Sequence, residues 1–241
     1  MSLFIYAILF SSVVISGLSV VIFKISEKNL KLLLSFSGAY LFAITVLHLI
    51  PEIYSRQNNT IGIYILIGFL LQILLEFFSE GIEHGHIHIH EHSNKAFPFT
   101  MMLGLSVHSF IEGMPLASNG SNAVNSYQNT FLLGIMLHNI PIAIALMSML
   151  LQSHMKRQSA VLMLVIFACV TPFGTFTAQL IGAGMIENIA QYFDRIMAIV
   201  IGIFLHISTT ILFESSENHR FNLIKFMTIL AGVGMALIGA L

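Results

Sequence analysis

Charged side chains are scarce in this chain. Only 9% of its 241 residues are Asp, Glu, Lys or Arg, whereas soluble globular proteins carry about 25%. Hydrophobic residues make up 56% of the sequence, and the mean hydropathy is +0.89. Water is therefore not the main solvent of this protein, and the composition predicts an integral protein of the lipid bilayer.

Basic patches and paired cysteines are also missing. The net charge of -1 excludes a nucleic-acid binder that depends on an excess of Lys and Arg. The one cysteine, Cys169, lies in an apolar run, so a disulfide framework and a cysteine-based zinc knuckle are excluded. We expect Cys169 to be a small packed residue, and we expect neither a nucleic-acid partner nor a prosthetic group.

Long apolar runs dominate what the sequence does contain. A helix of about 20 apolar residues can cross a bilayer. The chain has eight such runs, at about Leu3–Phe23, Leu32–Ile50, Ile61–Phe78, Ala96–Ala117, Thr130–Leu151, Ala160–Gly184, Ile196–Phe213 and Phe221–Leu241. Because their connections are short, we predict an all-α, multi-pass bundle of eight transmembrane helices that forms a single domain over residues 1–241. Pro172 predicts a kink or break in the sixth run.

The distribution of Lys and Arg predicts the orientation of the bundle. Most of the 10 basic residues follow the odd-numbered runs: Lys24, Lys28, Lys31, Lys95, Lys156, Arg157, Arg220 and Lys225. By the positive-inside rule, that side is cytoplasmic and both termini face outside. No basic residue precedes the first run, so it does not read as a cleaved signal. From the short length and the absence of a targeting region, we expect a bacterial cytoplasmic (inner) membrane.

Ionisable residues inside two apolar runs are the main functional signal. His108 and Glu112 lie four residues apart in H-S-F-I-E-G, and His138 opens H-N-I-P in the next run. Such residues are costly in lipid and usually mark an ion or substrate pathway. In the predicted topology both histidines lie near the midplane, and Glu112 lies one turn above His108. Two imidazoles and a carboxylate suit a zinc-like cation.

A histidine-rich segment is a second, independent signal. The stretch E-H-G-H-I-H-I-H-E-H falls in the predicted cytoplasmic loop at about residues 80–95. It places five histidines at alternate positions: His84, His86, His88, His90 and His92. Tracts of this kind are typical of metal binding, and a flexible loop would bind weakly and exchange quickly. The alternative is a solvated linker with no ligand role.

These motifs together resemble the ZIP (Zrt/Irt-like) family of divalent-metal transporters. The matching features are H-S-F-I-E-G, H-N-I-P, H-L-I-P-E from His48 to Glu52, T-P-F-G from Thr171 to Gly174, and the His-rich loop. The resemblance implies a ZIP-like fold and transport of Zn²⁺ into the cytoplasm without ATP, by an elevator-like movement of one helix group. It extends the cargo to Fe²⁺, Mn²⁺, Co²⁺ or Cd²⁺. It also implies that His108, Glu112 and His138 hold the transported ion.

The chain departs from the family pattern at two acidic positions. Ile142 stands where many members have the glutamate of H-N-I-P-E-G, and Thr171 replaces a glutamate before the proline of the sixth run. We therefore expect one intramembrane ion site rather than two, with Ser109 and Asn139 as weaker oxygen ligands.

A path for the ion is predicted on either side of that site. His48 and Glu52 at the outer end of the second run could receive the ion. Residues on and after the seventh run could accept it on the inside: His206, Glu214, Glu217 and His219. For His206 alone, a hydrogen bond to a neighbouring helix is an equal alternative.

Two other functions remain open. A membrane metal sensor or receptor would bind the ion without conducting it. An intramembrane metalloenzyme is less favoured, since its signature H-E-x-x-H does not occur in the sequence. Pairs of small residues permit helix contacts within or between chains, so the sequence leaves a homodimer open as well.

Overall fold

The structure is a computed structural model of the chain. It describes residues 3–23, 25–55, 60–79, 97–117, 124–153, 155–183, 189–214 and 223–239. The described residues form helices and contain no strand. The helices are α1 (Leu3–Ile22), α2 (Glu27–Ile44), α3 (Ile50–Ser55), α4 (Ile61–Ser79), α5 (Phe97–Gly113), α6 (Val124–Gln152), α7 (Arg157–Ala168), α8 (Val170–Ala183), α9 (Ile189–Glu214) and α10 (Leu223–Ile238).

Six helical segments among the described residues are long and apolar enough to cross a membrane. They are Leu3–Ile22, Glu27–Ser55, Ile61–Ser79, Gln128–Gln152, Arg157–Gly182 and Tyr192–Phe213. The other two predicted runs coincide with α5 and α10, which have 17 and 16 residues. The chain is therefore a helical, multi-pass membrane protein, whereas the number of eight transmembrane helices stays a prediction.

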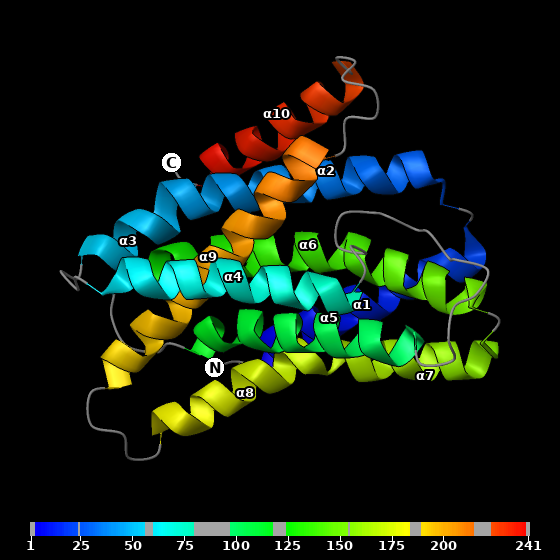
Figure 1. Cartoon of the computed structure of the whole chain (residues 1–241), viewed down its shortest axis with the longest axis horizontal. Coiled ribbons are helices and arrows are strands. Elements are labelled where there is room, and N and C mark those ends of the chain that lie inside the picture. The colour runs from blue at the N-terminus through cyan, green and yellow to red at the C-terminus, as the bar shows by residue number, and fades with distance from the viewer. Residues whose placement is uncertain are drawn as a thin grey trace.

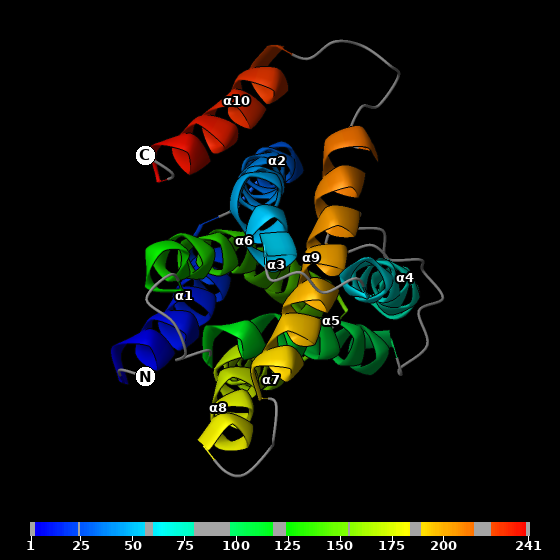
Figure 2. The same cartoon turned by 90° about the vertical axis from the view of Figure 1, so that its left-hand side faces the viewer.

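Successive helices run back and forth along the long axis of the molecule, and both chain ends lie toward the same end of that axis (Figures 1 and 2). The second segment begins with a cap, because Ser26 accepts a hydrogen bond from the Asn29 N–H at 3.3 Å. It contains a π-helical turn at Thr45–Leu49, in which the Ile50 N–H donates to the Thr45 carbonyl. α3 follows this turn directly.

The predicted break in the sixth run is confirmed. α7 ends at Ala168 and α8 begins at Val170. Pro172 has no N–H to donate to the carbonyl of Ala168, which lies four residues earlier, so the helix cannot continue with regular bonding. Cys169 lies at the break and is exposed, so its prediction as a packed residue was wrong. It lies on the same exposed face as Ile166 and Phe173, three residues before it and four after it.

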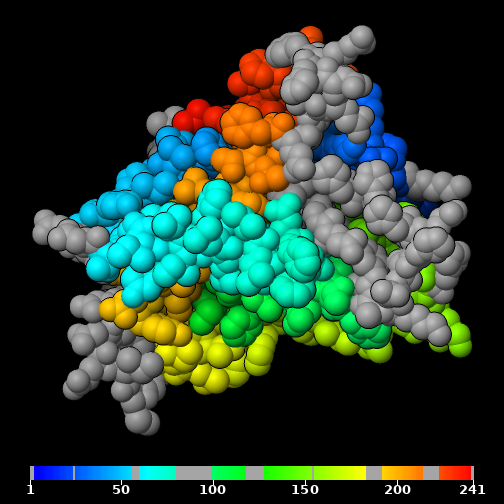
Figure 3. All heavy atoms as spheres, in the orientation of Figure 1, coloured from blue at the N-terminus to red at the C-terminus, as the bar shows by residue number. Residues whose placement is uncertain are grey.

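The helices divide into central and peripheral ones. In the most apolar 18-residue stretch of α6 and of α9, 67% of the residues are buried within the molecule. The corresponding share is 17% in α1 and 22% in α4. The outward face of α4 is apolar and includes Leu66, Leu70 and Phe77. The atoms of α4, coloured cyan, form much of the surface in Figure 3. An apolar outer surface of this kind suits contact with lipid.

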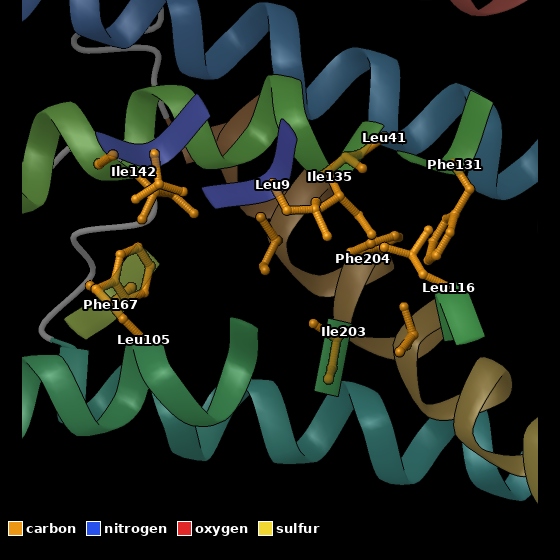
Figure 4. Close-up of a cluster of buried hydrophobic side chains, with 14 of the residues drawn as sticks. Leu9, Leu41, Leu105, Leu116, Phe131, Ile135, Ile142, Phe167, Ile203 and Phe204 are labelled. Atoms are coloured by element: carbon orange, nitrogen blue, oxygen red, sulfur yellow. The ribbon is translucent and has the colours of Figure 1, made fainter. Parts of the chain in front are cut away.

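The core lies between the central helices and their neighbours. The buried side chains drawn in Figure 4 include Leu41 of α2, Ile135 of α6 and Ile203 of α9. Phe131 of α6 and Phe204 of α9 have their ring centroids 6.0 Å apart. This apolar packing surrounds the few polar residues that the bundle buries.

Candidate metal site

Five predicted site residues are enclosed within the bundle. His108, Ser109 and Glu112 of α5 and His138 of α6 are 0% exposed, and Asn139 of α6 is 1% exposed. Burying such groups costs free energy unless they find a partner. Their burial in one apolar bundle therefore calls for a ligand or for contacts among themselves.

The structure brings the two histidines and the glutamate together. His108 Nε2 lies 3.3 Å from Glu112 Oε2, one helical turn away on α5. The rings of His108 and His138 have centroids 5.9 Å apart and are nearly perpendicular, at 83°. His108 is therefore the shared member, in contact with a carboxylate on its own helix and with an imidazole on α6.

The residues that follow His108 and His138 in the sequence carry buried oxygen atoms without hydrogen-bond partners among the described residues. Neither Ser109 Oγ nor Asn139 Oδ1 has a hydrogen-bond partner among the described residues, although both atoms are buried. Buried polar atoms are normally satisfied, so each exception needs an explanation. Hydroxyl and amide oxygens are weak ligands for divalent cations, and a role in completing a coordination sphere would explain both.

The present arrangement is not a complete metal cage. Within the described part of the chain, no group of three or more His, Cys, Asp or Glu side chains stands ready to hold a metal ion. The donor types nonetheless fit zinc, which takes imidazole nitrogen and carboxylate oxygen. An incoming ion would replace the contact between His108 and Glu112 and draw these groups into its own coordination sphere.

Helix breakers lie next to the site on both helices. α5 ends at Gly113, one residue after Glu112, and continues as a 3₁₀ turn at Met114–Ala117 that contains Pro115. Pro141 lies inside the continuous helix α6. It has no N–H to donate to the carbonyl of Leu137, which is next to His138. Thus the regular α-helix ends next to Pro115, whereas α6 continues through Pro141 without a break.

The two positions that lack the acid seen in many ZIP proteins lie inside the core. Ile142 is 0% exposed and Thr171 is 2% exposed. The main chain of Thr171 packs directly against Gly113 of α5. Both positions therefore hold packed, uncharged side chains, which leaves Glu112 as the carboxylate of the buried cluster.

The predicted outer pair lies at the irregular end of the second segment. His48 belongs to the π-helical turn and Glu52 to α3. His48 Nε2 is buried without a hydrogen-bond partner among the described residues, and so is Thr45 Oγ1 in the same turn. π-turns often mark functional sites. Thr45 was not predicted, and the sequence carries no evident signal for it.

His206 of α9 contacts an acidic residue on the neighbouring helix α4. Its Nε2 lies 3.6 Å from Oε2 of Glu76 on α4, and its ring stands edge-on to Phe69, with centroids 4.9 Å apart. Sequence reasoning missed Glu76, although this acid falls within the third predicted run. Its partner depends on how α4 crosses α9, which the sequence does not show.

The remaining candidates are not described by the structure. Glu214 is the last residue of α9, but its side chain lies outside the described part. Seven other predicted ligands also lie outside the described residues: His84, His86, His88, His90, His92, Glu217 and His219.

Comparison with known proteins places the chain in a family. Residues 83–240 match the family described as ZIP zinc transporter, a family of transporters and not of enzymes. The chain is 29% identical over 121 residues to zinc transporter ZIP9 of Xenopus tropicalis, which is 49% of this chain and 39% of that protein. It is 28% identical over 121 residues to zinc transporter ZIP9 of Micropogonias undulatus, covering 49% of this chain and 38% of that protein.

The comparisons differ in how much they cover. The match spans well under half the length of the ZIP9 relatives. The family match is broader, because it takes in more than half of the chain and includes α5, α6 and α9 with all their described polar residues. The chain therefore belongs to the ZIP zinc transporter family.

Proposed function

We propose that this protein carries divalent metal ions, above all Zn²⁺, across a membrane into the cytoplasm through one intramembrane site. The observation that carries the proposal is the contact of His108 with both Glu112 and His138 at 0% exposure. Family membership and the description of the ZIP9 relatives as zinc transporters support zinc as the cargo.

The chemistry of the site favours passage over permanent retention. One carboxylate leaves a bound Zn²⁺ with a net positive charge, and a conducting site must be able to release its ion. His108, Glu112 and His138 would hold the ion, with Ser109 and Asn139 as additional oxygen donors. Fe²⁺, Mn²⁺, Co²⁺ and Cd²⁺ are proposed as secondary cargo, because imidazole and carboxylate accept several divalent metals.

The ion would reach the site from His48 and Glu52 and leave it past the second polar contact, between His206 and Glu76. Glu214, Glu217, His219 and the His-rich loop would receive it on the cytoplasmic side. The distribution of basic residues supports this direction and both termini outside, in the inner membrane of a bacterium. Neither ATP nor an enzymatic step is part of the proposal.

Uptake of radioactive zinc into proteoliposomes tests this function. We expect accumulation by the wild type and background levels for His108→Ala, Glu112→Gln and His138→Ala, because each removes one ligand. Thr228→Val is the matched control, since Thr228 is half-buried on α10 and, among the described residues, its hydroxyl bonds to the Ile224 carbonyl of its own helix. Tight zinc binding without accumulation would instead identify a non-conducting metal sensor and refute transport.

A further inference from the structure

The end of α5 departs from regular α-helical hydrogen bonding directly after Glu112. The last carbonyls of an α-helix have no N–H of their own helix to accept from. α5 ends at Gly113, directly after Glu112, and the next turn contains Pro115, which has no N–H. The turn that carries Glu112 is therefore the least supported part of α5 by its own hydrogen bonds.

Thr175 of α8 supplies a hydrogen-bond donor to this end of α5. Its hydroxyl is 0% exposed, and Oγ1 lies 2.8 Å from the carbonyl oxygen of Gly113 and 3.1 Å from that of Thr171. The hydroxyl has a single hydrogen to donate, and the shorter of the two contacts is the one that crosses between the helices. Thr175 therefore ties the last residue of α5 to α8.

Two glycines allow the helices to come this close. A Cβ added to Gly113 would collide with the carbonyl oxygen of Thr171, and one added to Gly174 would collide with that of Phe110. Both obstacles are main-chain atoms, which cannot move aside as a flexible side chain can. The backbones of α5 and α8 thus touch on both sides of the Thr175 hydrogen bond, as small residues permit in membrane helix pairs.

We propose that Thr175 is a positioning residue for the metal site. Its hydroxyl fixes the last turn of α5 against α8 and thereby holds the Glu112 carboxylate beside His108, ready for the ion. Thr175 does not touch the cargo and acts through Glu112. This role rests on the proposed function, because it presupposes that Glu112 binds metal.

The proposed role rests on the sensitivity of metal affinity to the position of each ligand. Glu112 is one residue from the anchored carbonyl and lies 3.3 Å from His108. Valine has the shape of threonine but no hydroxyl, so Thr175→Val removes the hydrogen bond that joins α8 to the Gly113 carbonyl. Loss of groups that orient metal ligands typically lowers metal affinity about 10- to 100-fold. We expect a loss in this range for Thr175→Val and near wild-type affinity for Thr175→Ser, which keeps the hydroxyl.

The experiment measures zinc affinity of the purified full chain in lipid nanodiscs by competition with a zinc-responsive dye. Thr177→Val is the matched control, because Thr177 lies on the same helix and its hydroxyl bonds only to Phe173 of that helix. Thermal unfolding is recorded for every variant. Weaker binding by Thr175→Val at unchanged melting temperature, with recovery in Thr175→Ser, supports the proposal, and wild-type affinity in Thr175→Val overturns it.

A double variant separates positioning from general loosening of the fold. If Thr175 acts through Glu112, adding Thr175→Val to Glu112→Gln causes no further loss of affinity, whereas independent effects would add. If neither Thr175→Val nor Thr175→Ala yields folded protein while Thr175→Ser does, the residue supports the whole fold and the positioning role is refuted. His108→Ala tests the proposed function separately: unchanged zinc affinity in that variant would refute the site itself.

Discussion

At the scale of single residues, the contact between His108 and Glu112 sets the energetics of the site. Each group would be costly to bury alone, and their 3.3 Å contact offsets part of that cost. In the proposed function, an arriving cation would replace this contact and take both groups as ligands. In the absence of metal, the contact gives each buried group a neighbour of complementary polarity.

Zinc affinity should fall as the pH is lowered. Zinc binds neutral imidazole and ionised carboxylate, so protons compete with the metal for His108, Glu112 and His138. Between about pH 7.5 and 5.5, where histidine commonly gains its proton, we expect a progressive loss of affinity in dye-competition measurements. Glu112→Gln should bind more weakly at every pH, because the anionic ligand is gone, while the two histidines keep the binding dependent on pH. Equal affinity of the two proteins across this range would contradict the participation of Glu112.

At the scale of helices, the molecule relies on close crossings at glycine. α4 and α9 approach so closely that a Cβ on Gly202 would collide with the carbonyl oxygen of Ile65, and one on Gly68 would collide with that of Ile199. α5 and α8 meet in the same way at Gly113 and Gly174. These crossings also determine which polar residues meet, since Glu76 and His206 belong to the first helix pair.

Gly174→Ala should destabilise the protein. The added methyl group would collide with the main chain of Phe110 and force α5 away from α8, at a cost of about 1–3 kcal/mol as for other overpacked sites. We expect a lower melting temperature and a lower yield of monodisperse protein. Gly234→Ala is the control, because a Cβ there meets nothing within 4 Å. Equal stability of the two variants would show that the α5–α8 contact can relax.

The sequence predicted these elements unevenly, for physical reasons. The spacing of His108 and Glu112 predicted their meeting on one helix, because i and i+4 stack in any α-helix. Pro172 predicted the break near Cys169, since proline cannot donate to the preceding turn. The contact of His206 with Glu76 could not be foreseen, because it depends on the crossing of two helices distant in sequence. The π-helical turn at Thr45–Leu49 likewise lacks a local signature.

At the scale of the whole molecule, the central helices carry the candidate site and the peripheral ones cover it. The buried polar residues of the site lie on α5 and α6, and α5 packs against α4 and α8. The outer faces of α1 and α4 are apolar. This division keeps the charged groups away from lipid. The eight-helix count and the sidedness of the bundle are whole-molecule predictions that still need an experiment.

Labelling of introduced cysteines tests the orientation. In a Cys169→Ala background the chain has no thiol of its own. Asn58→Cys should react with a membrane-impermeant maleimide in intact cells, because its loop is predicted to face outside. Ser93→Cys in the predicted cytoplasmic loop should react only after the membrane is permeabilised. The reverse pattern would invert the orientation and with it the proposed direction of transport.

The π-helical turn has a consequence for how this chain is compared with its relatives. Each residue of an α-helix rotates the direction of the next side chain by about 100°, so a turn that accommodates an extra residue resets the facing of all that follow. Downstream of Thr45–Leu49, Ile53 is 2% exposed and Tyr54 is 51% exposed. A relative whose second helix is regular throughout should therefore align with a one-residue gap at this turn. Without that gap, its outward-facing residues would be matched to the inward-facing ones of this chain.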